Sequence, residues 1–263
     1  MKYGVCLGMG QLDRIRTAAE CGFDYVEIGF AELARADETA VKALQDVLAE
    51  TGLACEAANG FIPGDIPLTG EHVDESQIRA HVETGMRRAK ELGIQVVVFG
   101  SGGARSLDEN TSFRCGFAQL AEFLGRIAGP IAAQYGIRIA VEPLRPQESN
   151  IINRVKEGVM LAAASGSENV GGLGDLFHMA SVNDDVENLC DLKGCIFHCH
   201  IATPALNTEK PRIYPSDPAE YDYRSFVRAA ESAGCPRCSI EAGCGDFDNE
   251  APKALAVLRS IRI

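Results

Sequence analysis

The chain has 263 residues and is acidic, with 25 Lys and Arg against 37 Asp and Glu and a formal net charge of −12. Hydrophobic residues make up 46% of the sequence, which is enough for a large core and argues against disorder. Because an acidic surface repels a polyanion and the sequence has no run of Lys and Arg, we expect no nucleic acid as a partner.

The N-terminal segment and the cysteines predict where the protein resides. Residues 1–5 lead into a strand pattern without a basic leader or a long apolar segment, so we expect neither a signal peptide nor a membrane span. The ten cysteines are scattered through apolar stretches, which favours buried thiols in a reducing compartment over a disulfide framework. We therefore expect a cytoplasmic protein that does not bind membranes.

The first half of the sequence alternates short apolar strands with amphipathic helices. Periodicity predicts strands at 3–7, 24–29, 53–58 and 95–99. It predicts helices at 12–21, 38–51, 74–92 and 112–135, the last with a potential break near Gly129 and Pro130. Gly52 and Gly93 mark the ends of the second and third of these helices.

The second half repeats the same unit, and its first strand is the clearest of the chain. Residues 137–141 are mostly apolar and β-branched, which predicts a strand buried on both faces of a parallel sheet. Pro143 cannot donate to a sheet, so this strand should end at Glu142. We expect further strands at 170–175, 195–201 and 237–241, and helices at 154–164, 182–191, 221–233 and 250–260.

Eight strand–helix units account for the sequence and leave no segment large enough for a second domain. We therefore predict one domain over 1–263. Strands that alternate with helices form parallel sheets, and eight of them in this length predict an α/β fold, a single closed (β/α)₈ TIM barrel. A doubly wound open sheet is the alternative, but residues 7–12 match only half of the Gly-x-Gly-x-x-Gly pattern that usually follows its first strand.

The last four predicted strands each end in a residue that can bind a metal. Glu142 ends the fifth, Asp175 the sixth, His198 or His200 the seventh, and Glu241 the eighth. Because strand ends converge at one mouth of a barrel, this set predicts a divalent-cation site with positions left for substrate. Periodicity does not choose between the two histidines, which share a face of the strand, and we take His200 because it is nearer the strand's end.

These motifs resemble the sugar phosphate isomerase/epimerase superfamily, the xylose isomerase-like barrels that include ketose 3-epimerases, hydroxypyruvate isomerases and inosose dehydratases. The resemblance spans essentially the whole chain and rests on VEP (141–143), DLFH (175–178), HCHIA (198–202), SIE (239–241) and Glu148. It implies one divalent ion, manganese before cobalt, magnesium or zinc, held by Glu142, Asp175, His200 and Glu241. It also implies that Glu142 and Glu241 exchange protons with the substrate, and that His178 and Glu148 contact its oxygens.

The same resemblance implies the reaction class. We expect a metal-dependent isomerase or epimerase of a small sugar or sugar derivative, which acts by proton transfer through a metal-bound cis-enediolate. A lyase of the inosose dehydratase type is an alternative on the same barrel. An endonuclease of the AP endonuclease type is a remote one, because it would need a zinc cluster with more histidines than the five present. The sequence leaves a homo-oligomer open.

Three further residues are weaker candidates for substrate binding. Ketose 3-epimerases typically carry an arginine six residues after the ligand histidine, where this chain has Leu206. Arg212 could replace it from a longer loop, or could be a solvated loop residue. Arg105 could bind a phosphate or carboxylate beside the glycines of 100–103, or could belong to a flexible loop. Asn59 is a candidate wall residue of the site.

Two other features favour structural interpretations. Glu27, near the end of the second strand, could bind a hydroxyl group, but a structural salt bridge is the favoured role. Cys235 and Cys238 have the spacing of a thiol pair. They open the eighth strand and so belong at the opposite, stabilising face of the barrel, which disfavours a zinc or redox role.

Overall fold

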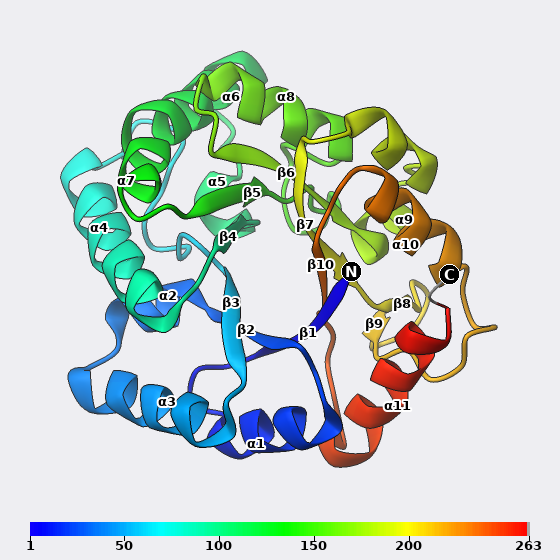
Figure 1. The fold of residues 1–263 in the computed structure, drawn as a ribbon. Coiled ribbons are helices and arrows are strands. Elements are labelled where there is room, and N and C mark those ends of the chain that lie inside the picture. Colours follow the sequence, from blue (N-terminus) through cyan, green and yellow to red (C-terminus); the bar gives the residue numbers. More distant parts are fainter. Residues whose placement is uncertain (262–263) are drawn as a thin grey trace.

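Eight parallel strands close into a barrel, and helices surround it (Figure 1). The computed structural model describes residues 1–261. Around the ring the strands follow the order β1-β10-β7-β6-β5-β4-β3-β2. They are β1 (Lys2–Leu7), β2 (Tyr25–Gly29), β3 (Ala54–Asn59), β4 (Val96–Phe99), β5 (Arg138–Val141), β6 (Val170–Asp175), β7 (Ile196–Ile201) and β10 (Arg237–Ile240). Because β1 pairs with both β2 and β10, the predicted (β/α)₈ barrel is confirmed and an open sheet is excluded.

Helices connect the strands and form the outer layer of the barrel (Figure 1). They include α1 (Leu12–Cys21), α3 (Glu38–Thr51), α4 (Glu75–Leu92), α6 (Phe113–Glu122), η1 (Phe123–Ala128), α7 (Gly129–Gln134), α8 (Val155–Ser165), η2 (Val186–Leu192), α10 (Tyr223–Ser232) and α11 (Phe247–Ser260). Gly52 and Gly93 end α3 and α4 in the left-handed conformation, as predicted, with φ of 67° and 86°.

The predicted break near Gly129 and Pro130 is wrong. The π-helical segment η1 joins α6 to α7 without an interruption, and Pro130 stands in the first turn of α7. Pro130 has no N–H to donate, so the continuous run lacks one backbone hydrogen bond at this position. The predicted helix at 182–191 is also different, since its place is taken by the 3₁₀ helix η2.

Four short elements follow strand ends and were not expected from the sequence. They are α2 (Phe30–Arg35), α5 (Gly102–Arg105), α9 (Leu176–Ser181) and an antiparallel hairpin of β8 (Thr203–Pro204) with β9 (Arg212–Ile213). Each is too short to show a clear period. They matter because they stand at the mouth of the barrel, where they carry side chains toward the strand ends.

The glycines of β6 make room for bulky neighbours. A Cβ atom on Gly171 would lie 2.7 Å from the ring of Phe197, and one on Gly174 would lie 2.9 Å from Leu189. Real Cβ atoms do not approach other atoms so closely. The glycines that weaken β6 by propensity are therefore required by packing against β7 and η2.

Side chains fill the interior of the barrel below its mouth. One buried cluster consists of Tyr25, Ala57, Val96, Val98, Ala140 and Leu173, with Phe197 packed against it. At the N-terminal end, Arg237 lies 3.2 Å from a carboxylate oxygen of Glu56 and donates a hydrogen bond of 2.6 Å to Gln95. The interior of the barrel is thus a packed core and not a pore.

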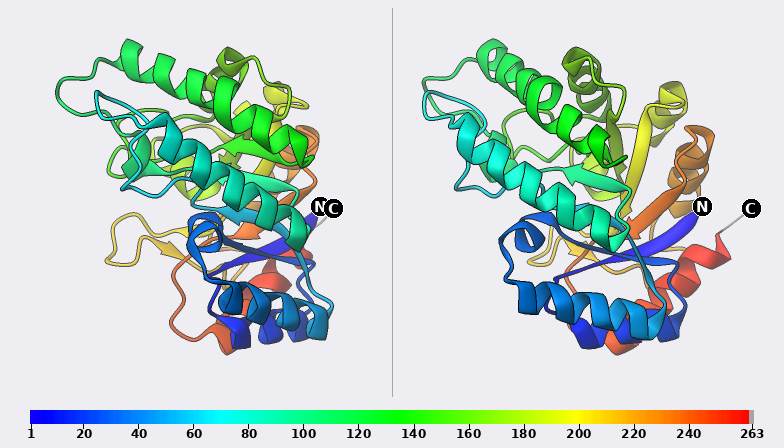
Figure 2. Two further views of the ribbon diagram at one scale, coloured as in Figure 1. Left: turned by 90° about the vertical axis from the view of Figure 1, so that its left-hand side faces the viewer. Right: turned by 60° about the vertical axis from the view of Figure 1, so that its left-hand side comes forward.

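The long loops project from one end of the barrel. In the left view of Figure 2, the cyan, green and yellow loops extend away from the end at which the N-terminus lies. Among residues 1–261, every helix is too short or too polar to cross a membrane.

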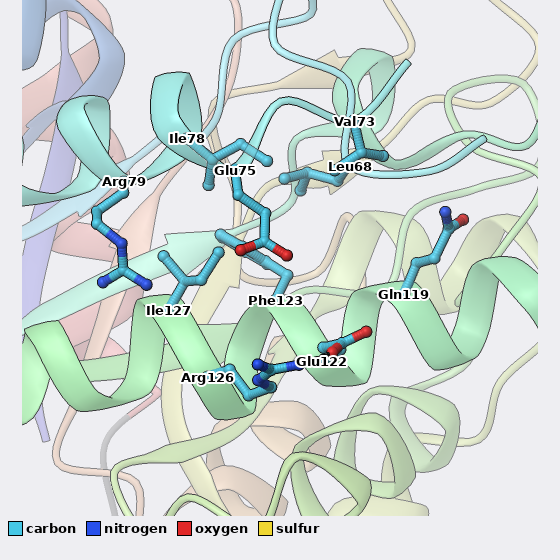
Figure 3. Close-up of a pocket in the computed structure, with 10 residues that line it drawn as sticks. All are labelled: Leu68, Val73, Glu75, Ile78, Arg79, Gln119, Glu122, Phe123, Arg126 and Ile127. Carbon is cyan, nitrogen blue, oxygen red and sulfur yellow. Dashed lines mark hydrogen bonds and ion pairs between the residues drawn. The ribbon is translucent and has the colours of Figure 1, made fainter. Parts of the chain in front are cut away.

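A pocket of about 280 Å³ lies on the outside of the barrel, between α4 and the α6–η1 helix (Figure 3). Its lining consists of Leu68, Val73, Glu75, Ile78, Arg79, Gln119, Glu122, Phe123, Arg126 and Ile127. None of the predicted site residues lines it, so it is separate from the strand ends.

Candidate metal centre

Four predicted ligands meet at the mouth of the barrel. Glu142, Asp175, His200 and Glu241 each offer a ligand atom, and these atoms all lie within 4.8 Å of one another. His200 Nδ1 lies 3.1 Å from Glu142 Oε1, 3.1 Å from Glu241 Oε2 and 3.7 Å from Asp175 Oδ2. The imidazole nitrogen is thus faced by three carboxylates in one small space.

Local structure fixes the direction of two of these carboxylates. Glu142 follows β5, and its side chain occupies space that Gly100 leaves free, because a Cβ atom there would lie 2.3 Å from Glu142 Oε2. Asp175 is the last residue of β6 and caps α9, where its Oδ1 accepts a hydrogen bond of 2.8 Å from His178 N. The cap holds one oxygen of Asp175 and leaves the other, Oδ2, directed at the site.

The structure distinguishes the two histidines of β7. Both rings are fully buried, and both contact the carboxylate of Glu27 through Nε2, at 2.9 Å from His200 and 2.7 Å from His198. Only His200 also faces Glu142, Asp175 and Glu241. The structure therefore brings His200 to the predicted site and places His198 beside Glu27.

A cationic side chain already lies among the carboxylates. The guanidinium of Arg212, on β9, forms ion pairs with Asp175 and, at 2.6 Å, with Glu241 Oε2. It also lies over the ring of Phe177, 4.9 Å from the centroid. Arg212 is therefore part of the site and is not a solvated loop residue.

The electrostatic surroundings give two of the carboxylates different proton affinities. Burial raises the pKa of Glu142, and the nearby Glu241 raises it further. Burial would also raise the pKa of Glu241, but Arg212 and His200 hold it well below its ordinary value. One carboxylate thus holds a proton more readily than the other, as general acid–base chemistry requires.

His178 and Glu148 lie beside the ligands. His178 Nδ1 accepts a hydrogen bond of 3.0 Å from Arg145 N, so its proton belongs on Nε2. That Nε2 atom is buried, has no hydrogen-bond partner among residues 1–261, and lies 3.9 Å from Glu148 Oε2. A buried donor without a partner is costly, which makes it a candidate to bind a substrate oxygen.

The structure brings Asn59 to the site but not Arg105. Asn59 Nδ2 donates a hydrogen bond of 3.2 Å to Glu241 Oε1. Arg105 is fully buried, and its guanidinium donates to the backbone oxygens of Phe99 (2.9 Å) and Ile152 (3.3 Å). The prediction that Arg105 binds substrate is therefore corrected, because its donors hold neighbouring loops together beneath the mouth.

Sequence reasoning underestimated Glu27 and missed Cys6. Glu27 is fully buried and bonds both histidines of β7, which goes beyond a structural salt bridge. Cys6, on β1, forms a second candidate metal-binding group with His200 and Glu241. The sequence feature that could have identified Cys6 as a site residue is its position next to the end of the first strand.

Cys235 precedes β10, and Cys238 is the second residue of that strand. Both are buried free thiols, and Cys235 donates a hydrogen bond of 3.2 Å to the backbone oxygen of Arg237. Within residues 1–261, neither belongs to a group of three or more side chains that could hold a metal.

The four residues fit a divalent cation. Three carboxylates and one imidazole are hard or borderline donors, the kind that such ions prefer. Arg212 shows that the carboxylates accept a positive group at this position. Glu241 Oε2 lies 2.6 Å from the guanidinium of Arg212 and 3.1 Å from His200 Nδ1, so this oxygen already faces positive charge.

We expect metal binding to release a proton. Burial alone would lower the pKa of His200, but Glu241 and Glu27 hold it well above its ordinary value. At neutral pH His200 Nδ1 therefore carries a proton that an ion must displace, so affinity should fall as the pH is lowered. Calorimetry at pH 7 in two buffers of different ionisation enthalpy should show release of about one proton per ion. Identical heats in both buffers would contradict this expectation.

Comparison with known proteins identifies the fold family. A family model described as xylose isomerase-like TIM barrel matches residues 15–261. No curated protein sequence matches the chain. The family match supports the prediction of an enzyme.

Three similar solved structures share the fold over nearly their whole length. D-allulose 3-epimerase from Methylomonas sp. is 19% identical, with 100% of this chain and 98% of that chain covered and a TM-score of 0.82. The 3-keto-D-glucoside 4-epimerase YcjR from E. coli is 21% identical over 99% of both chains, with a TM-score of 0.79. The IOLI protein, solved with a bound zinc atom, is 19% identical over 99% of this chain and 96% of that chain, with a TM-score of 0.75.

Proposed function

The chain belongs to the xylose isomerase-like TIM barrel family, and we propose that it is a divalent-metal-dependent isomerase or epimerase of a small sugar or sugar derivative. The observation that carries this proposal is the meeting of Glu142, Asp175, His200 and Glu241 at the mouth of the barrel. The names of the similar structures, which include epimerases of small sugars, support the substrate class.

In this proposal the four residues hold one ion. Manganese is our first choice, because three of the four donors are hard carboxylates, with cobalt, magnesium and zinc as alternatives. When bound, the ion would polarise a sugar carbonyl and an adjacent hydroxyl group, which acidifies the C–H bond beside them.

Glu142 and Glu241 move the proton. They follow β5 and β10, which lie three strand positions apart around the ring, so they approach the mouth from different sides. One carboxylate removes the acidified proton and leaves a planar enediolate. Return of a proton to the other face inverts the carbon, whereas return to the neighbouring carbon interconverts aldose and ketose.

The other side chains of the site bind and orient the substrate. His178 Nε2, a buried donor that no other described residue bonds, is suited to a hydroxyl or carbonyl oxygen. Glu148 accepts from Arg145 Nε at 2.6 Å and has a second oxygen 3.9 Å from His178. Arg212 places a positive charge near the substrate oxygen on which negative charge develops during the reaction. Asn59 orients Glu241 through its hydrogen bond.

Replacement of His178 by alanine should separate substrate binding from metal binding. The expected result is a higher KM or a lower kcat with unchanged metal content, because His178 touches Asp175 only through its backbone N–H. Steady-state kinetics and metal analysis of the purified variant measure the two effects. Loss of the metal from His178→Ala would contradict the assignment.

The proposed reaction is tested with a panel of substrates in deuterated water. Ketoses, keto-glycosides and inososes are incubated with the protein and manganese, and products are identified by NMR. An epimer or isomer with deuterium at the reacting carbon is expected. A dehydrated product would instead identify a lyase, and complete inertness toward the panel would contradict the proposed substrate class.

We also propose one domain over 1–263 and a cytoplasmic location. An endonuclease role gains no support from the site. His81, one of the histidines outside the predicted ligand set, bonds the backbone oxygen of Phe61 at 2.9 Å and does not extend the set toward a zinc cluster. The net charge of −12 likewise disfavours DNA.

A further inference from the structure

Glu27 lies directly beneath the predicted ligands and uses both of its oxygens. Its side chain is fully buried on β2. Glu27 Oε1 lies 2.9 Å from His200 Nε2. Glu27 Oε2 lies 2.7 Å from His198 Nε2 and accepts a hydrogen bond of 2.6 Å from Ser239 Oγ. An ionised carboxylate is only an acceptor, so both histidine nitrogens must carry protons that they donate to Glu27.

This contact decides which nitrogen of His200 remains for a metal. A neutral imidazole carries one proton, and Glu27 holds that proton on Nε2. Once an ion has displaced the second proton of His200, Nδ1 is the atom that offers a lone pair, and Nδ1 is the atom that faces Glu142 and Glu241, at 3.1 Å from each. The two ends of one ring thus have separate partners, a carboxylate below and the site above.

Further contacts hold Glu27 in place. Ser239 is paired in register with His200 on the neighbouring strand, and its hydroxyl lies 2.8 Å from the hydroxyl of Tyr25. The ring of Tyr25 needs the space at Gly4, where a Cβ atom would lie 2.3 Å from it. The position of the carboxylate is therefore determined by packed interior side chains and not by a loop.

We propose that Glu27 is a positioning residue that fixes the tautomer and orientation of His200, so that Nδ1 is presented to the divalent ion. The inference rests on the proposed metal centre and assigns a role to a residue outside the ligand set. In metal sites, removal of a carboxylate that bonds the non-ligating nitrogen of a ligand histidine typically weakens metal binding by about 10- to 100-fold.

Zinc titration of four proteins tests the proposal. The wild type is compared with Glu27→Ala, Glu27→Gln and Glu56→Gln, and dissociation constants are measured by competition with a chelator. Glu56 is the matched control, because it is a buried carboxylate at the opposite end of the barrel, where it pairs with Arg237. We expect zinc binding to weaken by about 10- to 100-fold in Glu27→Ala, by less in Glu27→Gln, which keeps an acceptor oxygen, and not at all in Glu56→Gln.

A second measurement uses only the wild type and does not depend on the folding of any variant. In zinc-loaded protein labelled with ¹⁵N-histidine, NMR should show a proton on Nε2 of His200 and zinc on Nδ1. The opposite assignment would overturn the proposal, as would wild-type zinc affinity in a folded Glu27→Ala protein. If the wild type itself binds no zinc at these residues, the metal centre fails and the inference falls with it.

Discussion

Replacement of Glu142 or Glu241 by glutamine is expected to lower turnover by about a hundredfold or more. Glutamine keeps an oxygen that can face a cation but removes the group that accepts a proton. The two carboxylates suit the task because the pKa of Glu142 is raised by burial and by Glu241, whereas Arg212 and His200 lower that of Glu241. Turnover of an identified substrate, with metal content measured on the same samples, gives the result.

Two comparisons make this test specific. Glu56→Gln removes a buried carboxylate from the far end of the barrel and should keep near-native turnover. Exchange of the reacting C–H with deuterated solvent should be lost in parallel with turnover in the Glu142 and Glu241 variants. Near-native turnover in both glutamine variants would show that these carboxylates take no part in proton transfer.

Replacement of Asp175 or His200 by alanine should abolish metal binding. Each change removes one of four converging donors, and Asp175→Ala also removes the cap of α9 and one partner of Arg212. Metal analysis after dialysis against manganese measures the loss. Circular dichroism of the same samples shows whether the barrel is intact.

His198→Ala is the matched control for His200→Ala. The two histidines lie on the same strand and are equally buried, but His198 does not face the other ligands. We expect His198→Ala to retain the metal. Full retention in Asp175→Ala and His200→Ala would refute the ligand assignment, and loss from His198→Ala alone would show that the wrong histidine was chosen.

The barrel and the convergence of its strand ends were predictable because both follow from short-range patterns. Apolar runs such as 137–141 predict buried parallel strands, and the fold then brings the ends of β5, β6, β7 and β10 together. No detail of side-chain packing is needed for that step. The carboxylates Glu142, Asp175 and Glu241 could therefore be placed in one site from sequence alone.

The remaining features depend on contacts between distant residues. Glu27 and His200 are 173 positions apart in the sequence, and nothing local to either residue shows that they bond. Arg105 stands beside a run of glycines typical of an anion-binding loop, but α5 turns its guanidinium toward the backbone oxygens of Phe99 and Ile152. Arg212 reaches Asp175 only because β8 and β9 pair, and neither two-residue strand has a readable pattern.

The closure of the ring has a consequence for how the protein is made. β10 must pair with β7 on one side and with β1 on the other, and Glu241 directly follows it. During synthesis, Glu142 and Asp175 leave the ribosome long before Glu241, so the growing chain cannot assemble all four ligands until its last barrel strand emerges. Until then the edges of β1 and β7 lack partners, which exposes them to pairing with other chains. A bound ion would thus stabilise the finished barrel but could not guide the early steps of its folding.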